Sequence, residues 1–233
     1  MSSASGGGKT TLVTKAGELL GAATLFFDDY RDASTYPPDL KKWVTDGADL
    51  NLWKTPKFAD DLAALKRGES IVTPIGGATI SPTEFIVIEE PMGRWRDEMA
   101  KSIDFVALID TPLDIAMARR FLRLADTNTS ANMRQVTKEL LIASPREFVR
   151  DYLDVSRSIY IAVQEQVAAD CDLVLDGRLP PTNWQSSLWR RSASGRHDGA
   201  AADVDHFAGD VARHVAGEED GEVGDVGRLA DAA

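Results

Sequence analysis

The stretch "SSASGGGKTTL" (residues 2–12) decides how the rest of the chain is interpreted. Three glycines precede a lysine and two threonines, and an apolar pattern of helical spacing begins at Leu12. Glycine-rich backbone can turn several N–H groups toward one point, and a helix that starts there adds the positive end of its dipole. The stretch is therefore typical of a loop that binds phosphate. The alternative is a flexible Gly/Ser-rich start.

The full loop pattern is glycine, four residues of any type, glycine, lysine, and serine or threonine. Gly8, Lys9 and Thr10 satisfy its second half, and Ser3 stands at the first glycine position. We expect Lys9 to neutralise the β- and γ-phosphates of ATP, and the Thr10 hydroxyl to be a ligand of Mg²⁺. The predicted ATP-binding residues are Ser5, Gly6, Gly7, Gly8, Lys9, Thr10 and Thr11.

Up to residue 182 the chain alternates short apolar runs with helical patterns, as mainly parallel α/β sheets do. The expected strands are 22–27, 85–90, 104–110 and 172–176. The expected helices follow the loop, span 58–68, run from 111 to about 124, and run from 144 to about 169. We therefore predict an α/β three-layer sandwich of the P-loop NTPase type. Such a sheet has its first strand in the centre, and the start of this chain is too short for one, so we expect that strand to be missing.

Two domains of different character are expected. Residues 1–182 form the α/β domain, with an aromatic insert at 30–57 and a lid at 119–142. Residues 183–233 contain five Lys and Arg against ten Asp and Glu, without a sustained period. That composition predicts an acidic, disordered tail.

Composition excludes several classes of function. The net charge of −11 argues against non-specific nucleic-acid binding, which needs a basic surface. Cys171 is the only cysteine, so a disulfide framework is excluded and a buried apolar role is expected. All three histidines lie after residue 196, so the main body contains no histidine base. No apolar run is long enough to span a membrane, and we expect a cytoplasmic protein. The sequence leaves the oligomeric state open.

Carboxylates follow two of the expected strands. In an α/β sheet the carboxyl ends of the strands form the ligand crevice. Asp28, with Asp29 beside it, is expected to accept or orient the proton of an attacking hydroxyl, and a solvated turn is the alternative. Glu89 is expected to hold Mg²⁺ through water. The alternative for Glu89 and Glu90 is a helix-capping or ion-pairing role.

Arginines and aromatic residues supply the other candidates. Arg119, Arg120 and Arg123 would clamp the transferred phosphoryl group when a lid closes, or would simply interact with the dipole of their helix. Tyr30 and Arg94 are further candidates for binding the substrate. The aromatic residues of the insert would stack on a planar base or form a small core of their own.

Five stretches in this order resemble the uridine kinase and phosphoribulokinase group of P-loop kinases: "SASGGGKTT", "FFDDYRD", "PKFADDLAALKRGE", "IDTPLDIAMARRFLR" and "DCDLVLDG". The resemblance covers roughly residues 3–178. It implies ATP, Mg²⁺ and transfer of the γ-phosphate to a hydroxyl of a small molecule. It also implies that Asp28 faces that hydroxyl and that the three arginines belong to the lid.

The chain departs from the family between residues 70 and 84. Uridine kinases usually carry Tyr-Asp and His-x-Arg elements there, whereas "SIVTPIGGATISPTE" contains no His, Tyr or Arg. Glu90 and Pro91 also replace the glycine that usually follows the acid of the next strand. Uridine is therefore only the family's default acceptor. A kinase for another hydroxyl compound, or a nucleotide-binding regulatory or inactive protein, remains an alternative.

Overall fold

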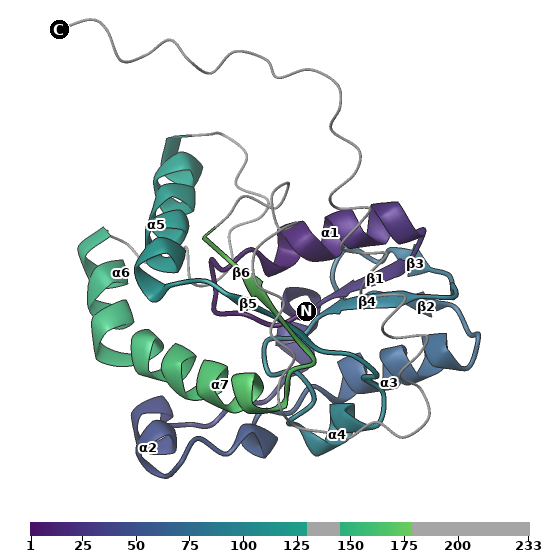
Figure 1. The fold of residues 1–233 in the computed structure, drawn as a ribbon, viewed down its shortest axis with the longest axis horizontal. Helices are drawn as coiled ribbons and strands as arrows, with labels where there is room; N and C mark the ends of the chain where they lie inside the picture. The colour runs from purple at the N-terminus through teal and green to yellow at the C-terminus, as the bar shows by residue number, and fades with distance from the viewer. Residues whose placement is uncertain (130–144, 179–233) are drawn as a thin grey trace, which may run out of the picture.

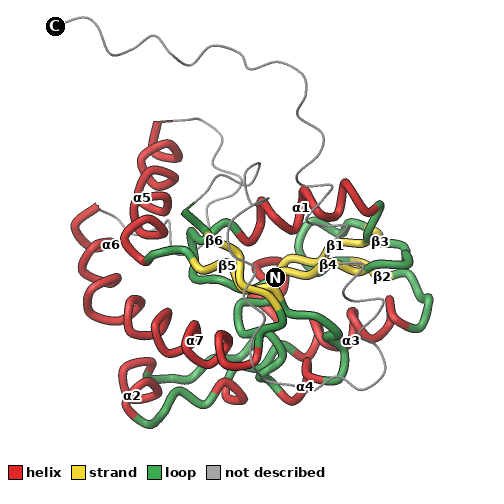
Figure 2. The backbone as a smooth tube through the Cα atoms, in the orientation of Figure 1, coloured by secondary structure: helices red, strands yellow, loops and turns green. Residues whose placement is uncertain are grey.

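The computed structural model describes residues 1–129 and 145–178. The expected lid residues 130–142 and the expected tail 183–233 lie outside the described residues. The described part has a central sheet with helices on both sides (Figures 1 and 2). Within that part, no helix is both long and apolar enough to cross a bilayer.

The sheet is built from two pairs of parallel strands. β1 (Ala23–Phe26) pairs with β4 (Ile86–Glu89), and β5 (Ala107–Asp110) pairs with β6 (Leu173–Asp176). All four were expected from continuous apolar runs, which is the pattern of strands covered on both faces. The α/β class and the parallel arrangement are confirmed.

Met1 and Ser2 lie between the two strand pairs and join them. On the β4 side, the Met1 amine donates to the Ile88 carbonyl at 2.8 Å, and the Glu90 N–H donates to the Met1 carbonyl at 3.1 Å. On the other side, Ser2 exchanges two hydrogen bonds of 2.8 Å with the backbone of β5. The order across the sheet is therefore β1, β4, residues 1–2, β5, β6. The place expected to lack a strand is held by these two residues, which we call the seam.

The seam does not extend along the full length of its neighbours. Beyond Met1, a cavity of about 440 Å³ separates the start of β4 from the segment that leads into β5. Its walls include Ile86 and Val87 on one side and Ile103 and Phe105 on the other.

Helices cover both faces of the sheet and complete three layers. On one face, α1 (Lys9–Leu20) packs Val13 and Ala16 against Val87. On the opposite face, α3 (Pro56–Lys66) covers β1 and β4, and α7 (Arg157–Asp170) covers β5. This placement of helices on both faces agrees with strand geometry, because successive residues of a strand point to opposite faces of the sheet.

The long helix expected over 144–169 is confirmed. α6 (Pro145–Asp151) continues through a π-helical turn over Tyr152–Ser156 into α7. No proline or glycine in the sequence marks this local change of helix type. α5 (Leu113–Thr129) begins where proline and threonine predicted and runs past residue 124.

Several short elements were not anticipated. β2 (Ile71–Val72) and β3 (Thr79–Ile80) form a small antiparallel hairpin in the stretch that departs from the family. The insert contains α2 (Leu40–Thr45), and α4 (Asp97–Ala100) follows β4. The insert region also contains two 3₁₀ segments, η1 (Phe27–Ala33) and η2 (Leu50–Leu52).

Candidate functional site

The glycine-rich stretch forms a closed turn between the seam and α1. Gly6 and Gly8 have φ values of 84° and 102°, a region that residues with a Cβ rarely adopt. The Gly7 N–H donates to the Ala4 carbonyl at 3.0 Å, which closes the turn. The Thr111 hydroxyl, just after β5, donates to the Gly7 carbonyl at 2.9 Å and ties the loop to the sheet. The loop is thus packed and is not a flexible start.

Three predicted residues converge where this loop meets α1. The Lys9 ammonium donates to the carbonyls of Ser3 and Ala4 at 3.0 and 3.1 Å, and lies 3.8 Å from the carboxylate of Glu89. The Thr10 hydroxyl donates to the same carboxylate at 2.8 Å. Lys9 and Glu89 are both buried. A cation, a hydroxyl and a carboxylate therefore meet at the N-terminus of a helix.

A cavity of about 420 Å³ opens beside these residues. Its polar wall comes from the loop and the strand ends. Its apolar wall comes from the insert and α7. The lining residues are Ser3, Ala4, Ser5, Lys9, Phe27, Asp28, Arg31, Asp32, Tyr36, Trp53, Glu89, Pro91, Met92, Ile159, Tyr160, Val163 and Gln164. A small organic molecule fits a cavity of this size and character.

The two neighbouring aspartates have different surroundings. Asp28 lines the cavity, as expected for a group that meets a substrate hydroxyl. Asp29 is not among the lining residues, although it follows directly. Burial raises the pKa of the Asp29 carboxyl, and the nearby Asp28 and Glu89 carboxylates raise it further. The structure therefore brings Asp28, and not Asp29, to the cavity.

Tyr30 and Arg94, both predicted to bind substrate, lie elsewhere. Tyr30 is buried in the core, where it stacks on Phe58 and donates to the Asp61 carboxylate at 3.0 Å. Arg94 forms ion pairs with Asp170 at 3.0 Å and Asp172 at 2.6 Å. Arg94 thus fastens the end of α7 and the start of β6, outside the cavity.

The three arginines of α5 are separated. The Arg120 side chain packs against the loop. Its Cγ would lie only 2.9 Å from a Cβ placed on Gly6. Its guanidinium donates to the Tyr160 hydroxyl at 2.9 Å and lies over the ring of Phe148. Arg119 donates to the carbonyl of Gly177, and Arg123 is exposed on the helix surface. Arg120 is the one of the three nearest to the loop, and the phosphoryl-clamping role stays a prediction for all of them.

Sequence reasoning found only part of the apolar wall. Base stacking and a small core were both open for the aromatic residues of the insert, and Tyr36 and Trp53 line the cavity; Arg31 also lines it but had no predicted role of its own. Tyr160, Val163 and Gln164 share one side of α7 by helical spacing, and that spacing was a usable signal. The insert, with little regular structure, offered no comparable period.

The residues at the loop fit a magnesium–nucleotide complex. A threonine hydroxyl and a carboxylate are the hard oxygen donors that Mg²⁺ prefers. Among the described residues there is no group of three or more His, Cys, Asp and Glu placed to hold a metal ion. A Mg²⁺ ion near Thr10 and Glu89 would therefore take its other ligands from water and phosphate, as it commonly does with nucleotides.

Comparison with known proteins agrees with this chemistry. The chain is 27% identical over 190 residues to the uridine kinase of Borrelia duttonii (strain Ly), covering 75% of this chain and 84% of that protein. It is 28% identical over 135 residues to the uridine kinase of Borreliella burgdorferi (strain ZS7), covering 53% and 65%. No family model matches the chain. These distant similarities, together with the α/β fold, indicate a protein of the kinase type.

Proposed function

We propose that the chain is an ATP-dependent phosphotransferase that moves the γ-phosphate to a hydroxyl group of a small molecule. The observation that carries the proposal is the meeting of Lys9, Thr10 and Glu89 at the start of α1, beside a cavity that Asp28 also lines. The relatives named uridine kinase make a nucleoside such as uridine the first acceptor to test.

Each residue then has a distinct role. The loop N–H groups and Lys9 hold the phosphates, because fixed dipoles and a buried cation stabilise negative charge strongly. Thr10 and Glu89 hold Mg²⁺, which neutralises charge on the phosphates. Asp28 orients the acceptor hydroxyl and accepts its proton. Arg119, Arg120 and Arg123 are proposed to stabilise the transferred group.

A non-nucleoside acceptor is the second candidate, and one observation favours it. In the stretch 70–84 the family's usual contacts are replaced by the hairpin β2–β3, and no residue of this hairpin lines the cavity. The acceptor would instead meet Tyr36, Trp53 and Met92. These side chains suit a flat or apolar molecule without requiring a nucleobase.

The test measures ADP formation with ATP, Mg²⁺ and a panel of nucleosides and other small alcohols. Unaltered protein is expected to phosphorylate at least one of them. Asp28→Asn should lower kcat by ~10²-fold or more while ATP still binds, since proton transfer commonly contributes that much. Asp32→Asn is the matched control, because Asp32 lies at the exposed edge of the same cavity. ATP binding without transfer to any acceptor would support the regulatory or inactive alternative.

A further inference from the structure

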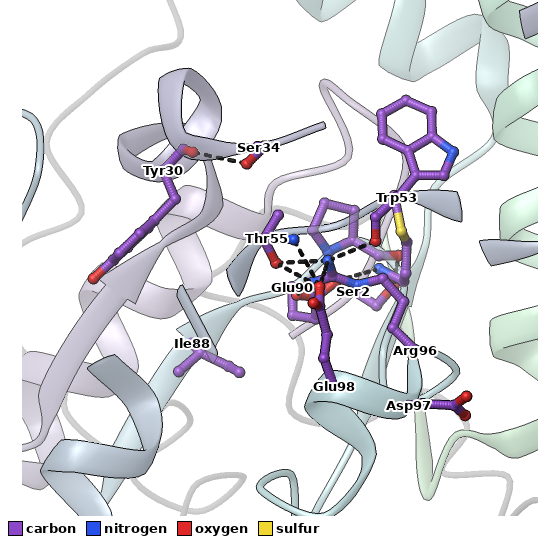
Figure 3. Close-up of polar contacts among 12 residues, drawn as sticks. Ser2, Tyr30, Ser34, Trp53, Thr55, Ile88, Glu90, Arg96, Asp97 and Glu98 are labelled. Atoms are coloured by element: carbon purple, nitrogen blue, oxygen red, sulfur yellow. Dashed lines mark hydrogen bonds and ion pairs between the residues drawn. The ribbon is translucent and has the colours of Figure 1, made fainter. Parts of the chain in front are cut away.

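Arg96 is the most deeply buried charged side chain near the cavity, although it is not among the lining residues. Its exposed fraction is 0%. Arginine is seldom fully buried unless it is paired. Figure 3 shows its guanidinium at the centre of a polar network that joins the insert to the end of β4.

On the insert side, Arg96 holds residues 53–55 through one nitrogen. Its Nη1 donates to the Thr55 hydroxyl at 2.6 Å, to the Trp53 carbonyl at 3.2 Å, and to the Glu98 carboxylate at 2.9 Å. The Glu98 carboxylate also accepts the Thr55 N–H at 2.7 Å. The backbone on both sides of Lys54 is therefore anchored in the interior.

On the side of β4, the other terminal nitrogen of Arg96 holds the segment that follows the strand and that carries Met92. Arg96 Nη2 donates to one oxygen of Glu90 at 2.5 Å, and the second oxygen of Glu90 accepts the Met92 N–H at 3.1 Å. The guanidinium also lies 5.9 Å from the centre of the Phe27 ring. Trp53, Met92 and Phe27 all line the cavity, and Arg96 contacts or fixes all three from behind.

The Trp53 indole depends on this anchor for its position. It packs edge-on against Tyr36, with ring centres 5.0 Å apart, and against Trp43, at 5.7 Å. A displacement of the Trp53 carbonyl would therefore move the indole and its contact with Tyr36. The apolar wall of the cavity would move with it.

Stability alone does not account for the network. Replacing a buried ion pair by apolar residues is often neutral or stabilising, because the desolvation of both charges is costly. The planar guanidinium group of arginine can form several hydrogen bonds at once in fixed directions, which neither lysine nor an apolar residue can do. Here those directions point to two segments that both line the cavity, the backbone at Trp53 and, through Glu90, the backbone at Met92.

We propose that Arg96 is a positioning residue for the acceptor part of the site, because it holds Trp53 at a fixed distance from Met92. The proposal rests on the proposed phosphotransferase function. Within the described residues, the hydrogen bonds of Arg96 go to Trp53, Thr55, Glu90 and Glu98, and none goes to the nucleotide part built by residues 3–11. Arg96 thus sets affinity for the acceptor and leaves affinity for ATP unaffected.

The first arm of the test is kinetic and uses Arg96→Lys beside Arg94→Lys. Arg94 is the matched control, because it carries the same chemical change two positions away and pairs with α7 and β6 instead. Arg96→Lys is expected to raise the KM for the acceptor by ~10-fold or more, because lysine cannot hold both segments at once and a small displacement of Trp53 weakens acceptor binding. KM for ATP should remain within about twofold, and Arg94→Lys should leave both constants unchanged.

The second arm does not depend on activity. The emission of Trp53 is obtained for each protein by subtracting the spectrum of its Trp53→Phe counterpart. Arg96→Lys is expected to shift this emission and Arg94→Lys is not. If unaltered protein phosphorylates no acceptor, the proposed function fails while this arm still tests the positioning role.

A milder variant covers the case in which Arg96→Lys does not fold. Glu98→Gln keeps an oxygen toward Thr55 and Arg96 but removes a charge, so it should shift the Trp53 emission and the acceptor KM in the same direction by a smaller factor. An unchanged Trp53 emission in a folded variant overturns the proposal. An equal rise in the KM values of acceptor and ATP also overturns it.

Discussion

Replacing Gly7 by alanine tests whether the opening residues are packed as a phosphate-binding loop. A Cβ at this position would lie 1.8 Å from the Ser3 hydroxyl oxygen, 2.8 Å from the Ser3 Cβ and 2.9 Å from the Ala4 carbonyl oxygen. Gly7 is not among the glycines with positive φ, so the penalty is steric and does not include backbone strain. Crowding a packed region by one methyl group typically costs ~1–3 kcal/mol.

The contacts with Ser3 and with Ala4 differ in how easily they are relieved. The buried Ser3 hydroxyl has no hydrogen-bond partner among the described residues, so its displacement breaks no bond. The Ala4 carbonyl accepts from both Gly7 and Lys9 and cannot move without loosening the loop. We therefore expect Gly7→Ala to lower the free energy of unfolding by about 2 kcal/mol.

A double-mutant cycle separates the contributions. Ser3→Gly removes the hydroxyl and the Cβ that an alanine at position 7 would meet. The double variant should therefore recover about 1 kcal/mol relative to the sum of the two single changes. The measurement is urea unfolding at equilibrium, followed by far-ultraviolet circular dichroism. A Gly7→Ala protein as stable as the unaltered one, or two changes that simply add, would refute the packed loop.

Three other changes test the remaining contacts. Glu89→Gln removes the negative charge beside the buried Lys9 ammonium, so urea unfolding should show a loss of ~2 kcal/mol, and added Mg²⁺–ATP should stabilise the variant less than the unaltered protein. Tyr30→Phe removes a buried hydrogen bond to the Asp61 carboxylate and should cost ~1.5 kcal/mol. The pKa of Asp29 is raised by burial and by neighbouring carboxylates, so its ionised form opposes folding. Asp29→Asn should therefore stabilise the fold at pH 7 by less than about 1 kcal/mol, and the gain should vanish near pH 3, where the carboxyl is neutral in both states. A gain that grows on acidification would contradict the last prediction.

The strand ends and the loop were predictable because simple rules govern them. The rule that parallel strands end at one edge of a sheet was sufficient to bring Lys9, Thr10 and Glu89 together from sequence separations of about eighty residues. The same rule could not separate Asp28 from Asp29, since a one-residue difference at a strand end is decided by the 3₁₀ turn of η1.

The roles of Arg94 and Arg96 show where sequence reasoning ended. Both follow β4 in the sequence, two positions apart, and sequence position alone does not separate a residue that pairs at the surface from one that is fully buried. In the structure Arg94 fastens α7 to β6, and Arg96 is fully buried behind the cavity. Asp170, which pairs with Arg94, and the Trp53 carbonyl, which accepts from Arg96, are distant in sequence and reach the arginines through the tertiary fold, whereas Glu90 and Glu98 are near Arg96 in the sequence.

The seam divides the sheet into two pairs of strands, and the site draws residues from both pairs. Asp28 and Glu89 belong to the pair β1 and β4, whereas Thr111 belongs to the pair β5 and β6. Within the described residues, the backbone hydrogen bonds of Met1 and Ser2 join the two strand pairs, and the loop, the overlying helices and side-chain contacts such as the Lys66–Asp104 ion pair add to them. A molecule bound by the loop, where the two strand pairs meet, would hold the pairs together. Occupancy of the site and resistance of the protein to unfolding should therefore rise and fall together.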